Sequence, residues 1–464
     1  MNLKFNFYKP ILRISLITAG FILLSGLEKG FAQQKITLEQ AIQMALENNI
    51  QLKQTKFSVA LSEEQYHQSK WNLTPNLNAN SGLNYSFGRT FDQLSGQSFD
   101  QNVTSANGNL SSSLVLFQGF QRVNQILQNK YTLEADKSNE QKAKNDLTLT
   151  VVTTYLQVLN AQDLSETAKQ QLDFALLQLD REQKLFNVGN KTLADLSQAK
   201  SQVANAELSL TNAVNQLDLA FLNLSQLLER NPTEKFEVVK PVVDVISTSS
   251  SQLAANDIYQ TALKSYPDIK LAENRRLAAN KAVWLARGGY YPRLSLNGSL
   301  STGYSSGRQR LIVGSNPPAF EEIPLSDQIT GNYNKGVGVS LVIPLWNGNQ
   351  ARSNVNRAKI NYQNATLSEQ LAKNNLNKVI NQAVYDLKAA QKRYYSTESA
   401  FNSAQDAFKV IEQRYQVGLV NSLDFNQAQL NLNRAQFDLI QAKYDLIFKT
   451  KVIDFYLGKP INFN

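Results

Sequence analysis

The chain contains the same segment twice, and this duplication constrains its fold more than any other feature of the sequence. Residues 186–189, Phe-Asn-Val-Gly, return 229 positions later as Tyr-Gln-Val-Gly at 415–418, and Asp195 returns as Asp424. Upstream, the copies align at an offset of 217 positions, with Ala45 matching Ala262, Lys53 matching Lys270 and Pro75 matching Pro292. A repeat of this length predicts the same structural elements twice, in the same order.

The first 32 residues have the pattern of a secretory signal peptide. Basic Lys4, Lys9 and Arg13 precede an uncharged run at 14–24, and small residues follow up to Ala32, where cleavage is expected. The run is shorter than the roughly 20 apolar residues that a membrane-spanning helix needs. The sequence therefore predicts a protein that leaves the cytoplasm.

Composition argues against several classes of function. The formal net charge is +9, but Lys and Arg are scattered and form no basic stripe for nucleic acid. The chain has no Cys and one His, His67, so it offers no obvious ligand set for a metal or cofactor. An isolated His without a Gly-x-Ser-x-Gly motif also gives no convergent catalytic set. We therefore expect no enzymatic activity, no metal, no cofactor and no nucleic-acid partner.

The duplication divides the chain into two repeats and a connector. Repeat 1 covers 33–230, with a strand pair at 76–117 and a helical hairpin that turns near Gly189. The connector, 231–252, contains Pro and Ser and is expected to hold one short strand. Repeat 2 covers 253–464, with a strand pair at 292–345 and a hairpin that turns near Gly418. The expected helices lie at 38–72, 118–187, 192–229, 255–290, 349–416 and 421–457.

The helices after the turns carry apolar residues at every seventh position. In repeat 2 this series is Phe425, Leu432, Leu439, Leu446 and Ile453, with an Ala series three positions further on. Such alternation of large and small residues is typical of a coiled-coil seam. A second apolar stripe contains Leu423, Leu430, Phe437 and Tyr444. A helix with two seams can pack against two neighbours, so these helices can close into a tube.

The strand pairs alternate apolar and small polar residues, as Leu77, Leu83 and Tyr85 do with the Asn and Ser residues between them. Segments of about 10 residues with this alternation are typical of membrane-spanning barrel strands. Four strands cannot close a barrel, and an open edge in hydrocarbon leaves backbone groups unpaired. Two copies would give eight strands with a filled interior, and three would give twelve with a lumen. Three fit the Asn, Ser and Gly of the polar face better.

The expected fold is therefore an α+β membrane protein. Four strands per chain complete a trimeric twelve-stranded barrel, which continues into a long α-helical coiled-coil barrel. Aromatic residues mark the places where strands meet helices: Trp71, Tyr290, Tyr291 and Trp346. We expect these four side chains to be anchors at the membrane interface, where Trp and Tyr are enriched.

Two stretches at the turns resemble the hairpin signature of the TolC family of outer-membrane efflux proteins. They read FNVGNKTLADLSQAKSQVANAELSLTNA from 186 and RYQVGLVNSLDFNQAQLNLNRAQFDLIQAKYDL from 414. The opening ITLEQAIQMALENNIQL is similar to that family's usual start, and the resemblance covers essentially the whole mature chain. It implies a homotrimer in the outer membrane of a Gram-negative bacterium, surrounded there by lipid, with its helical part in the periplasm.

The resemblance also implies a function. The chain would be a passive exit duct of a tripartite efflux or type I secretion system. A periplasmic adaptor would join it to an inner-membrane pump of the RND, ABC or MFS type. The resemblance leaves the cargo, the particular pump and adaptor, and the resting state of the duct open. The alternative is a structural or adhesive outer-membrane coiled-coil protein without transport activity.

At the periplasmic end, the resemblance implies an aperture formed by the helix turns. Gly189 and Gly418 would form the tip turns, and Asp195 and Asp424 would lie at the mouth as two rings of three carboxylates. Both Asp residues also have the spacing of a capping box behind Thr192 and Asn421, so each can complete a helix start. The two roles are compatible.

Members of the family often hold the mouth closed through links among Tyr, Arg and Asp. Here Tyr415 and Asp195 match, but Val420 stands at the Arg position. Gln427 also replaces the second Asp of the family's pattern. The aperture would therefore be latched differently or more weakly, and the candidate cations are Lys191 and Lys184.

Overall fold

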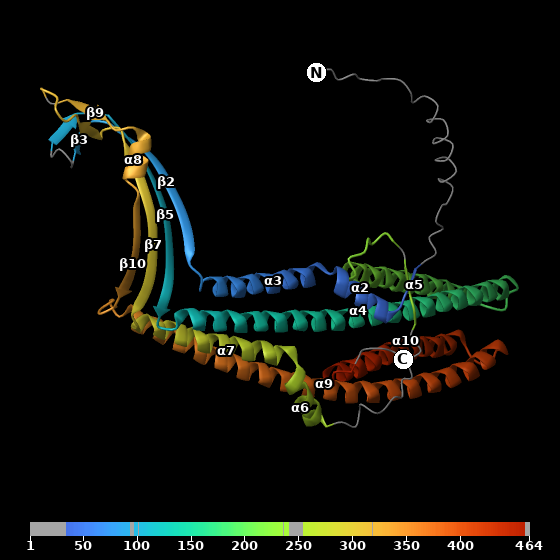
Figure 1. The fold of residues 1–464 in the computed structure, drawn as a ribbon. Helices are drawn as coiled ribbons and strands as arrows, with labels where there is room; N and C mark the ends of the chain where they lie inside the picture. Colours follow the sequence, from blue (N-terminus) through green and yellow to red (C-terminus); the bar gives the residue numbers. More distant parts are fainter. Residues whose placement is uncertain are drawn as a thin grey trace, which may run out of the picture.

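The computed structural model describes residues 34–92, 97–100, 102–234, 236–240, 254–317 and 319–459. The expected signal peptide lies outside these residues, as do residue 235 and the part of the connector from 241 to 252. Figure 1 shows two parts, a curved sheet of long strands and a layer of long helices that extends from one end of that sheet.

Four long antiparallel strands form the sheet. They are β2 (Asn76–Ser86), β5 (Val103–Gln118), β7 (Arg293–Ser305) and β10 (Asn334–Val342), in the order β10-β7-β5-β2. Asn76 lies opposite Ser113, and Arg293 lies opposite Val342. A shift of the first pair by 217 and 229 positions gives the second pair, so both strand pairs have the same register. Among the described strands, none pairs with the outer edge of β2 or of β10.

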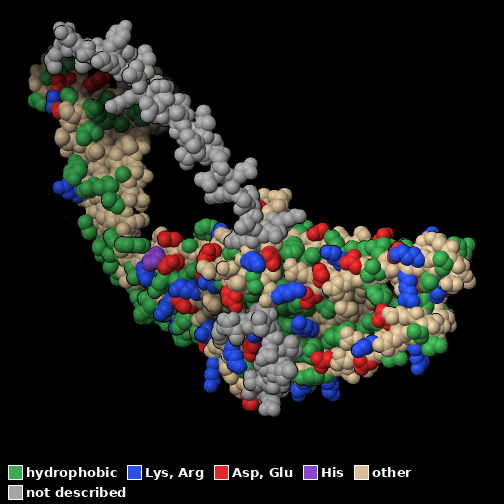
Figure 2. All heavy atoms as spheres, turned by 90° about the vertical axis from the view of Figure 1, so that its right-hand side faces the viewer, with side chains coloured by type: hydrophobic (Ala, Val, Ile, Leu, Met, Phe, Trp, Pro, Cys, Tyr) green, Lys and Arg blue, Asp and Glu red, His purple; other side chains and the backbone are tan. Residues whose placement is uncertain are grey.

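The two faces of the sheet differ in polarity. One face is hollowed, and this hollow is lined mainly by the small polar residues Asn76, Asn78, Ser111, Ser113, Asn297, Gly298, Ser299, Gly336 and Gly338. Successive side chains of a strand point to opposite faces, so the leucines between these residues lie on the other face. There Leu77, Leu83 and Leu341 are exposed. Figure 2 shows that charged side chains gather over the helical part and are sparse on the sheet.

The far ends of the strands carry small structured segments where the sequence indicated polar loops. A hairpin of β3 (Arg89–Asp92) and β4 (Gln97–Asp100) lies between β2 and β5. Between β7 and β10 lie a second hairpin, β8 (Gln309–Leu311) and β9 (Phe320–Glu322), and helix α8 (Leu325–Gly331). Buried Gln328 of α8 donates a hydrogen bond to the Ser305 carbonyl over 3.0 Å, which holds α8 against β7.

Each repeat has one very long helix and one helix of about half that length. They are α4 (Gln121–Asn187) and α5 (Leu193–Leu227) in repeat 1, and α9 (Gln350–Gln416) and α10 (Ser422–Tyr456) in repeat 2. The 67 residues of α4 or α9 correspond to a length of about 100 Å. The seam residues Leu196, Phe425 and Ile453 are buried. Within the described part of the chain, no helix combines the length and the apolar character needed to cross a bilayer.

The first helix of each repeat is interrupted, which corrects the expectation of unbroken helices at 38–72 and 255–290. Repeat 1 has α2 (Leu38–Asn48) and α3 (Ile50–Trp71), and repeat 2 has α6 (Ala255–Ser265), α7 (Pro267–Arg287) and the 3-10 turn η2 (Gly288–Tyr290). Asn49 is non-helical, and its side chain accepts the Leu52 N–H over 3.1 Å to start α3. Pro267 starts α7, where its missing N–H costs nothing, and it disfavours a helical Tyr266.

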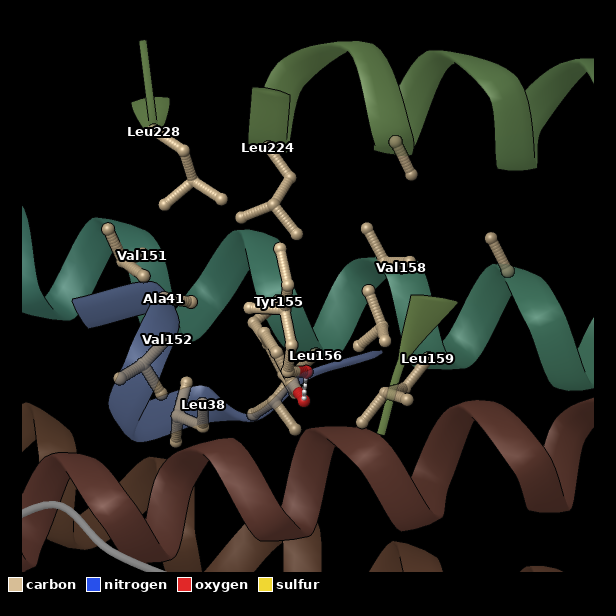
Figure 3. Close-up of a cluster of buried hydrophobic side chains, with 14 of the residues drawn as sticks. Leu38, Ala41, Val151, Val152, Tyr155, Leu156, Val158, Leu159, Leu224 and Leu228 are labelled. Atoms are coloured by element: carbon tan, nitrogen blue, oxygen red, sulfur yellow. Dashed lines mark hydrogen bonds between the residues drawn. The ribbon is translucent and has the colours of Figure 1, made fainter. Parts of the chain in front are cut away.

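A hydrophobic core joins residues 36–45 to the described part of the connector. Strand β1 (Gln34–Ile36) pairs in parallel with β6 (Phe236–Val238), a pairing that the sequence did not indicate. The Tyr155 hydroxyl of α4 lies 2.9 Å from the Ile36 carbonyl oxygen and 2.8 Å from that of Val239. Figure 3 shows Tyr155 among Leu38, Leu224 and other apolar side chains. This core packs α4 and α5 against β1 and α2.

Candidate functional site

The two helical hairpins turn at the same end of the helical layer, and both turns depend on a glycine. Gly189 has a φ of 79° and Gly418 a φ of 78°, a region that other residues rarely adopt. The Gly189 N–H donates to the Phe186 carbonyl over 3.0 Å, and the Asn190 N–H donates to that of Leu185 over 2.9 Å. The equivalent bonds at the other turn are Gly418 to Tyr415 and Leu419 to Arg414. Both turns are therefore Schellman motifs, which end a helix cleanly.

The helices that leave these turns start in different ways. At α5 the Thr192 hydroxyl accepts the Asp195 N–H over 3.2 Å, and the Asp195 carboxylate accepts the Thr192 N–H over 3.1 Å, which is a complete capping box. At α10 the Asn421 side chain accepts the Asp424 N–H over 2.8 Å, but the Asp424 carboxylate does not return the bond. Asp424 is exposed. The capping interpretation therefore holds fully for Asp195 alone.

Asp195 also joins the two hairpins. Its Oδ1 atom accepts a hydrogen bond from the Ser422 hydroxyl of α10 over 2.6 Å, while its Oδ2 atom accepts from the Thr192 hydroxyl over 2.7 Å. These bonds, first of all that from Ser422, lower the pKa of Asp195 to about 2. The carboxylate is thus ionised at neutral pH and fully engaged in the tip.

A buried acid, Glu182, makes the second connection between the hairpins. It lies near the end of α4 and is 2% exposed. The Tyr415 hydroxyl at the end of α9 donates to Glu182 Oε1 over 2.8 Å. The Lys191 ammonium donates to the Tyr415 oxygen over 3.0 Å and lies 3.6 Å from Glu182 Oε2. We call Glu182, Lys191 and Tyr415 the tip triad.

The charges of the tip triad compensate one another. Glu182 Oε2 is buried without a hydrogen bond, so the nearby Lys191 ammonium is its compensating charge. Burial alone would lower the pKa of Lys191, but the bond with Tyr415 and the nearby carboxylates raise it above its ordinary value. Burial raises the pKa of Tyr415. At neutral pH the triad therefore contains an ammonium and a neutral phenol.

Aromatic side chains hold the triad in place. The Tyr415 ring is stacked on Phe425 of α10, with ring centroids 4.5 Å apart and an interplanar angle of 15°. Phe174 of α4 and Phe408 of α9 pack around Phe425 in the same cluster. On the outer side, Arg181 donates to the Gln416 carbonyl over 3.4 Å. The tip is thus a contact between the hairpins with an apolar centre and a polar edge.

The structure places the expected tip residues in different roles. Of the two candidate cations, Lys191 contacts Tyr415, whereas Lys184 pairs with Asp180 of its own helix over 2.6 Å and lies outside the triad. In the described tip, Tyr415 donates directly to Glu182, and Lys191, which donates to Tyr415, also interacts electrostatically with Asp195. The sequence interpretation missed Glu182. A signal was present, because Glu182 aligns with Ile411 in the other copy.

The four expected membrane anchors lie where the strands meet the helices. Trp71 ends α3, Tyr290 and Tyr291 follow α7, and Trp346 lies between β10 and α9. All four side chains are exposed on the single chain, and Trp346 is 79% exposed. Among the described residues, no group of three or more acidic or His side chains is placed to hold a metal ion.

A sheet with a polar hollow on one face and an apolar opposite face, extended by helical hairpins with a charged tip, is the architecture of an outer-membrane channel with a helical extension. Comparison with known proteins supports this class. The sequence model of the family described as "Outer membrane efflux protein" matches residues 41–230 and 258–458. The chain therefore belongs to the outer membrane efflux protein family, and this confirms the resemblance and the outer-membrane location.

Individual relatives are similar to this chain over most of its length. It is 26% identical over 429 residues to "Outer membrane protein TolC" of Escherichia coli (strain K12), a match that covers 90% of this chain and 80% of that protein. It is 24% identical to "Cation efflux system protein CusC" of Escherichia coli O157:H7, over 84% of this chain and 78% of that protein. Among solved structures, one of CusC has a TM-score of 0.77 at 19% identity and covers 91% of this chain and 92% of its own. The Campylobacter jejuni CmeC outer membrane channel has a TM-score of 0.74 at 19% identity, with coverage of 91% and 85%.

Proposed function

We propose that three copies of this chain close into one duct across the outer membrane and much of the periplasm. The observation that carries this proposal is the pair of open edges on the sheet, because neither β2 nor β10 has a described partner on its outer side. Unpaired backbone groups at a strand edge cost several kcal/mol each in hydrocarbon. Pairing of β10 with β2 of the next copy removes both edges at once, and three copies supply twelve strands.

The helical layer supports the same closure. Within one chain α4 packs between α3 and α7, whereas α9 has only α7 along this part of its length. Ile360, Leu367 and Leu371 of α9 are accordingly exposed, although their counterparts in α4 are partly buried. On α3, Phe57 and Leu61 are exposed as well. The next copy's α3 would cover the apolar face of α9, as α7 covers α4 within the chain.

In this assembly the polar hollow of the sheet faces the lumen, and the apolar face contacts lipid. Trp71, Tyr290, Tyr291 and Trp346 then form the periplasmic aromatic belt. The hairpin tips form the periplasmic mouth, with Gly189 and Gly418 at its turns. Asp195 and Asp424 would line it as two rings of three carboxylates, which favours cations over anions.

The tip triad acts as the latch of this mouth. It joins the α4–α5 hairpin to the α9–α10 hairpin through Tyr415 and Glu182, and the Asp195–Ser422 bond is a second link between them. An outward movement of either hairpin breaks both links. The latch therefore keeps the mouth narrow until a partner at the tip offers contacts that replace them.

The proposed partners are a periplasmic adaptor and an inner-membrane pump, which deliver cargo to the mouth. Relatives carry names that point to different cargoes: "Toxin and drug export protein A" of Aggregatibacter actinomycetemcomitans and "Pyoverdine export outer membrane protein OpmQ" of Pseudomonas aeruginosa are two of them. A polar, generic lumen suits this diversity, because the pump rather than the duct would select the cargo.

Affinity purification from membranes, after mild cross-linking, tests this function. The tagged wild-type chain should recover an adaptor and an inner-membrane pump. As a matched control, the same chain with Leu432→Asp and Leu439→Asp, which should not assemble, should recover neither. Recovery of no inner-membrane protein by the wild type would instead favour a structural role for the coiled coil.

A further inference from the structure

A pocket of about 480 Å³ lies where the sheet meets the helical layer. It is formed by the end of α3, the segment that leads into β2, the last third of β5, the start of α4 and the start of β7. Its lining residues are Gln68, Ser69, Trp71, Asn72, Thr74, Pro75, Asn76, Ser113, Val115, Arg122, Gln125 and Arg293. Two of them are arginines, and no Asp or Glu is among them.

The two arginines are not neutralised by their surroundings. Arg122 donates to the backbone carbonyl of Asn72, which fixes its side chain in the pocket. Neither Arg122 nor Arg293 forms an ion pair with a described residue. Burial lowers the pKa of Arg122, and the positive charge of Arg293 lowers it further. Two like charges therefore share one pocket that no acidic side chain lines.

The internal repeat shows that the turn from strand to helix can be built without Arg122. The position equivalent to Arg122 in the other copy is Ala351, and the position equivalent to Arg293 is Asn76. Gly119 lies three residues before Arg122, and Gly348 lies three residues before Ala351. Their φ values are 56° and 59°, so the glycine of the turn has a similar φ in both copies. The turn from strand to helix thus does not require the charge of Arg122, which points to a role in binding.

The pocket opens on the polar side of the sheet. Asn76 and Ser113 line both this pocket and the hollow of the sheet. Arg293 is two residues before Ser295 and four before Asn297 on β7, so all three share one face. Arg293 is exposed and Arg122 partly exposed, so solutes can reach both. If the chain closes into the proposed duct, the pocket faces its lumen.

We propose that this pocket binds phosphate or carboxylate groups of anionic solutes in the lumen. The proposal rests on the proposed duct for its lumenal position and on the two arginines for its chemistry. A guanidinium matches the two oxygens of a carboxylate or phosphate in geometry as well as charge. Three copies place three such pockets around the duct. The barrel end of the lumen would then attract anions, whereas the carboxylates of the tip attract cations.

Calorimetric titration of the purified trimer with sodium pyrophosphate, at constant ionic strength, tests the pocket. The wild type should bind pyrophosphate. The double variant Arg122→Ala and Arg293→Asn introduces the residues of the other repeat, so it should fold, and it should bind at least about tenfold more weakly. Arg287→Gln is the matched control, because this cation lies over the Trp284 ring at the same junction but does not line the pocket. Absence of binding by the wild type, or equal binding by the double variant, overturns the proposal.

A second arm distinguishes a lumenal solute from a lipid headgroup as the source of the anion. The titration is repeated with the trimer in phosphatidylcholine nanodiscs. Binding in both detergent and nanodiscs places the pocket in the lumen, because lipid does not cover it. Binding in detergent alone shows a site at the lipid surface and overturns the lumenal position. Neither result depends on transport, so a failure of the pocket is distinct from a failure of the duct.

Discussion

Tyr415 makes its polar contacts at the tip through the hydroxyl and its apolar contacts through the ring. The hydroxyl connects Glu182 to Lys191, and the ring is stacked on Phe425. A change to Phe therefore removes the hydrogen bonds of the latch but keeps the ring that stacks on Phe425. Removal of one partner of a buried hydrogen-bonded acid typically costs about 1–3 kcal/mol.

We expect Tyr415→Phe to loosen the mouth while the helices stay folded. In planar lipid bilayers the variant should show a larger single-channel conductance than the wild type. Tyr395→Phe is the matched control, because Tyr395 is an exposed residue of the same helix whose hydroxyl forms no hydrogen bond with a described residue. Equal conductance of wild type and Tyr415→Phe would show that the triad does not restrict the mouth.

The second residue-scale prediction concerns pH. The pKa of Asp195 falls from an ordinary value of 3.8 to about 2, first because of the bond from Ser422. A carboxyl group with a lowered pKa stabilises the folded state above its unfolded pKa, and this contribution is lost as the pH falls through the folded pKa. Asp195 is partly exposed, and screening by solvent keeps this contribution modest.

Asp195→Asn should consequently be less thermally stable than the wild type at neutral pH, and the difference should shrink between about pH 4 and pH 2. Thermal unfolding of the two purified proteins across this range measures it. A difference that stays constant down to pH 2 would show that the charge of Asp195 contributes nothing to the tip.

At the scale of single residues, the sequence indicated which residues form the tip better than it indicated which residues they contact. Gly189, Gly418 and Asp195 could be identified because the duplication repeats them. Glu182 differs from its counterpart Ile411, but its contact could not be predicted, because its partner Tyr415 is 233 residues away and the two meet only when the hairpins pack. The same applies to Ser422, whose hydroxyl bonds to Asp195 of the other repeat.

Among the elements, α5 and α10 were the most predictable, because the seven-residue spacing persists through them. The interruptions between α2 and α3 and between α6 and α7 were less predictable. Asn49 and Tyr266 are not strong helix breakers, and the interruptions depend on the Asn49 cap and on Pro267. The β1–β6 pair was missed because each strand has three residues, and Tyr155 stabilises the pairing from a distant helix.

The seams of α10 give a prediction at this scale. Leu432 and Leu439 are partly buried in the single chain, so two Asp residues there would place charges between helices. The double variant Leu432→Asp and Leu439→Asp should therefore lose the trimer, which size-exclusion chromatography with light scattering can measure.

The control for the seam adds the same two charges at exposed positions of α10, through Asn431→Asp and Gln441→Asp. This variant should remain trimeric. Loss of the trimer in both variants would attribute the effect to charge alone, and persistence of the trimer in the Leu variant would show that the seam does not hold the assembly.

At the scale of the whole molecule, the repeat predicts which residues of neighbouring copies contact each other. Leu110 of β5 lies opposite Leu300 of β7. A shift of Leu110 forward by 229 positions and of Leu300 back by 217 positions gives Val339 of β10 and Leu83 of β2, the two strands with open edges. If each contact within the chain recurs between chains, the tube has an approximate sixfold order, and Val339 lies opposite Leu83 of the next copy.

Disulfide formation at this pair tests the closed trimeric duct most directly. The chain contains no Cys, so the variant Val339→Cys and Leu83→Cys introduces the only thiols. The variant Leu110→Cys and Leu300→Cys is the internal control, because it should form the same bond within one chain and run as a monomer on a denaturing gel. After oxidation in the outer membrane, the first variant should run as a covalent trimer. Monomers alone, with the control fully oxidised, would contradict the closure of three copies through β10 and β2.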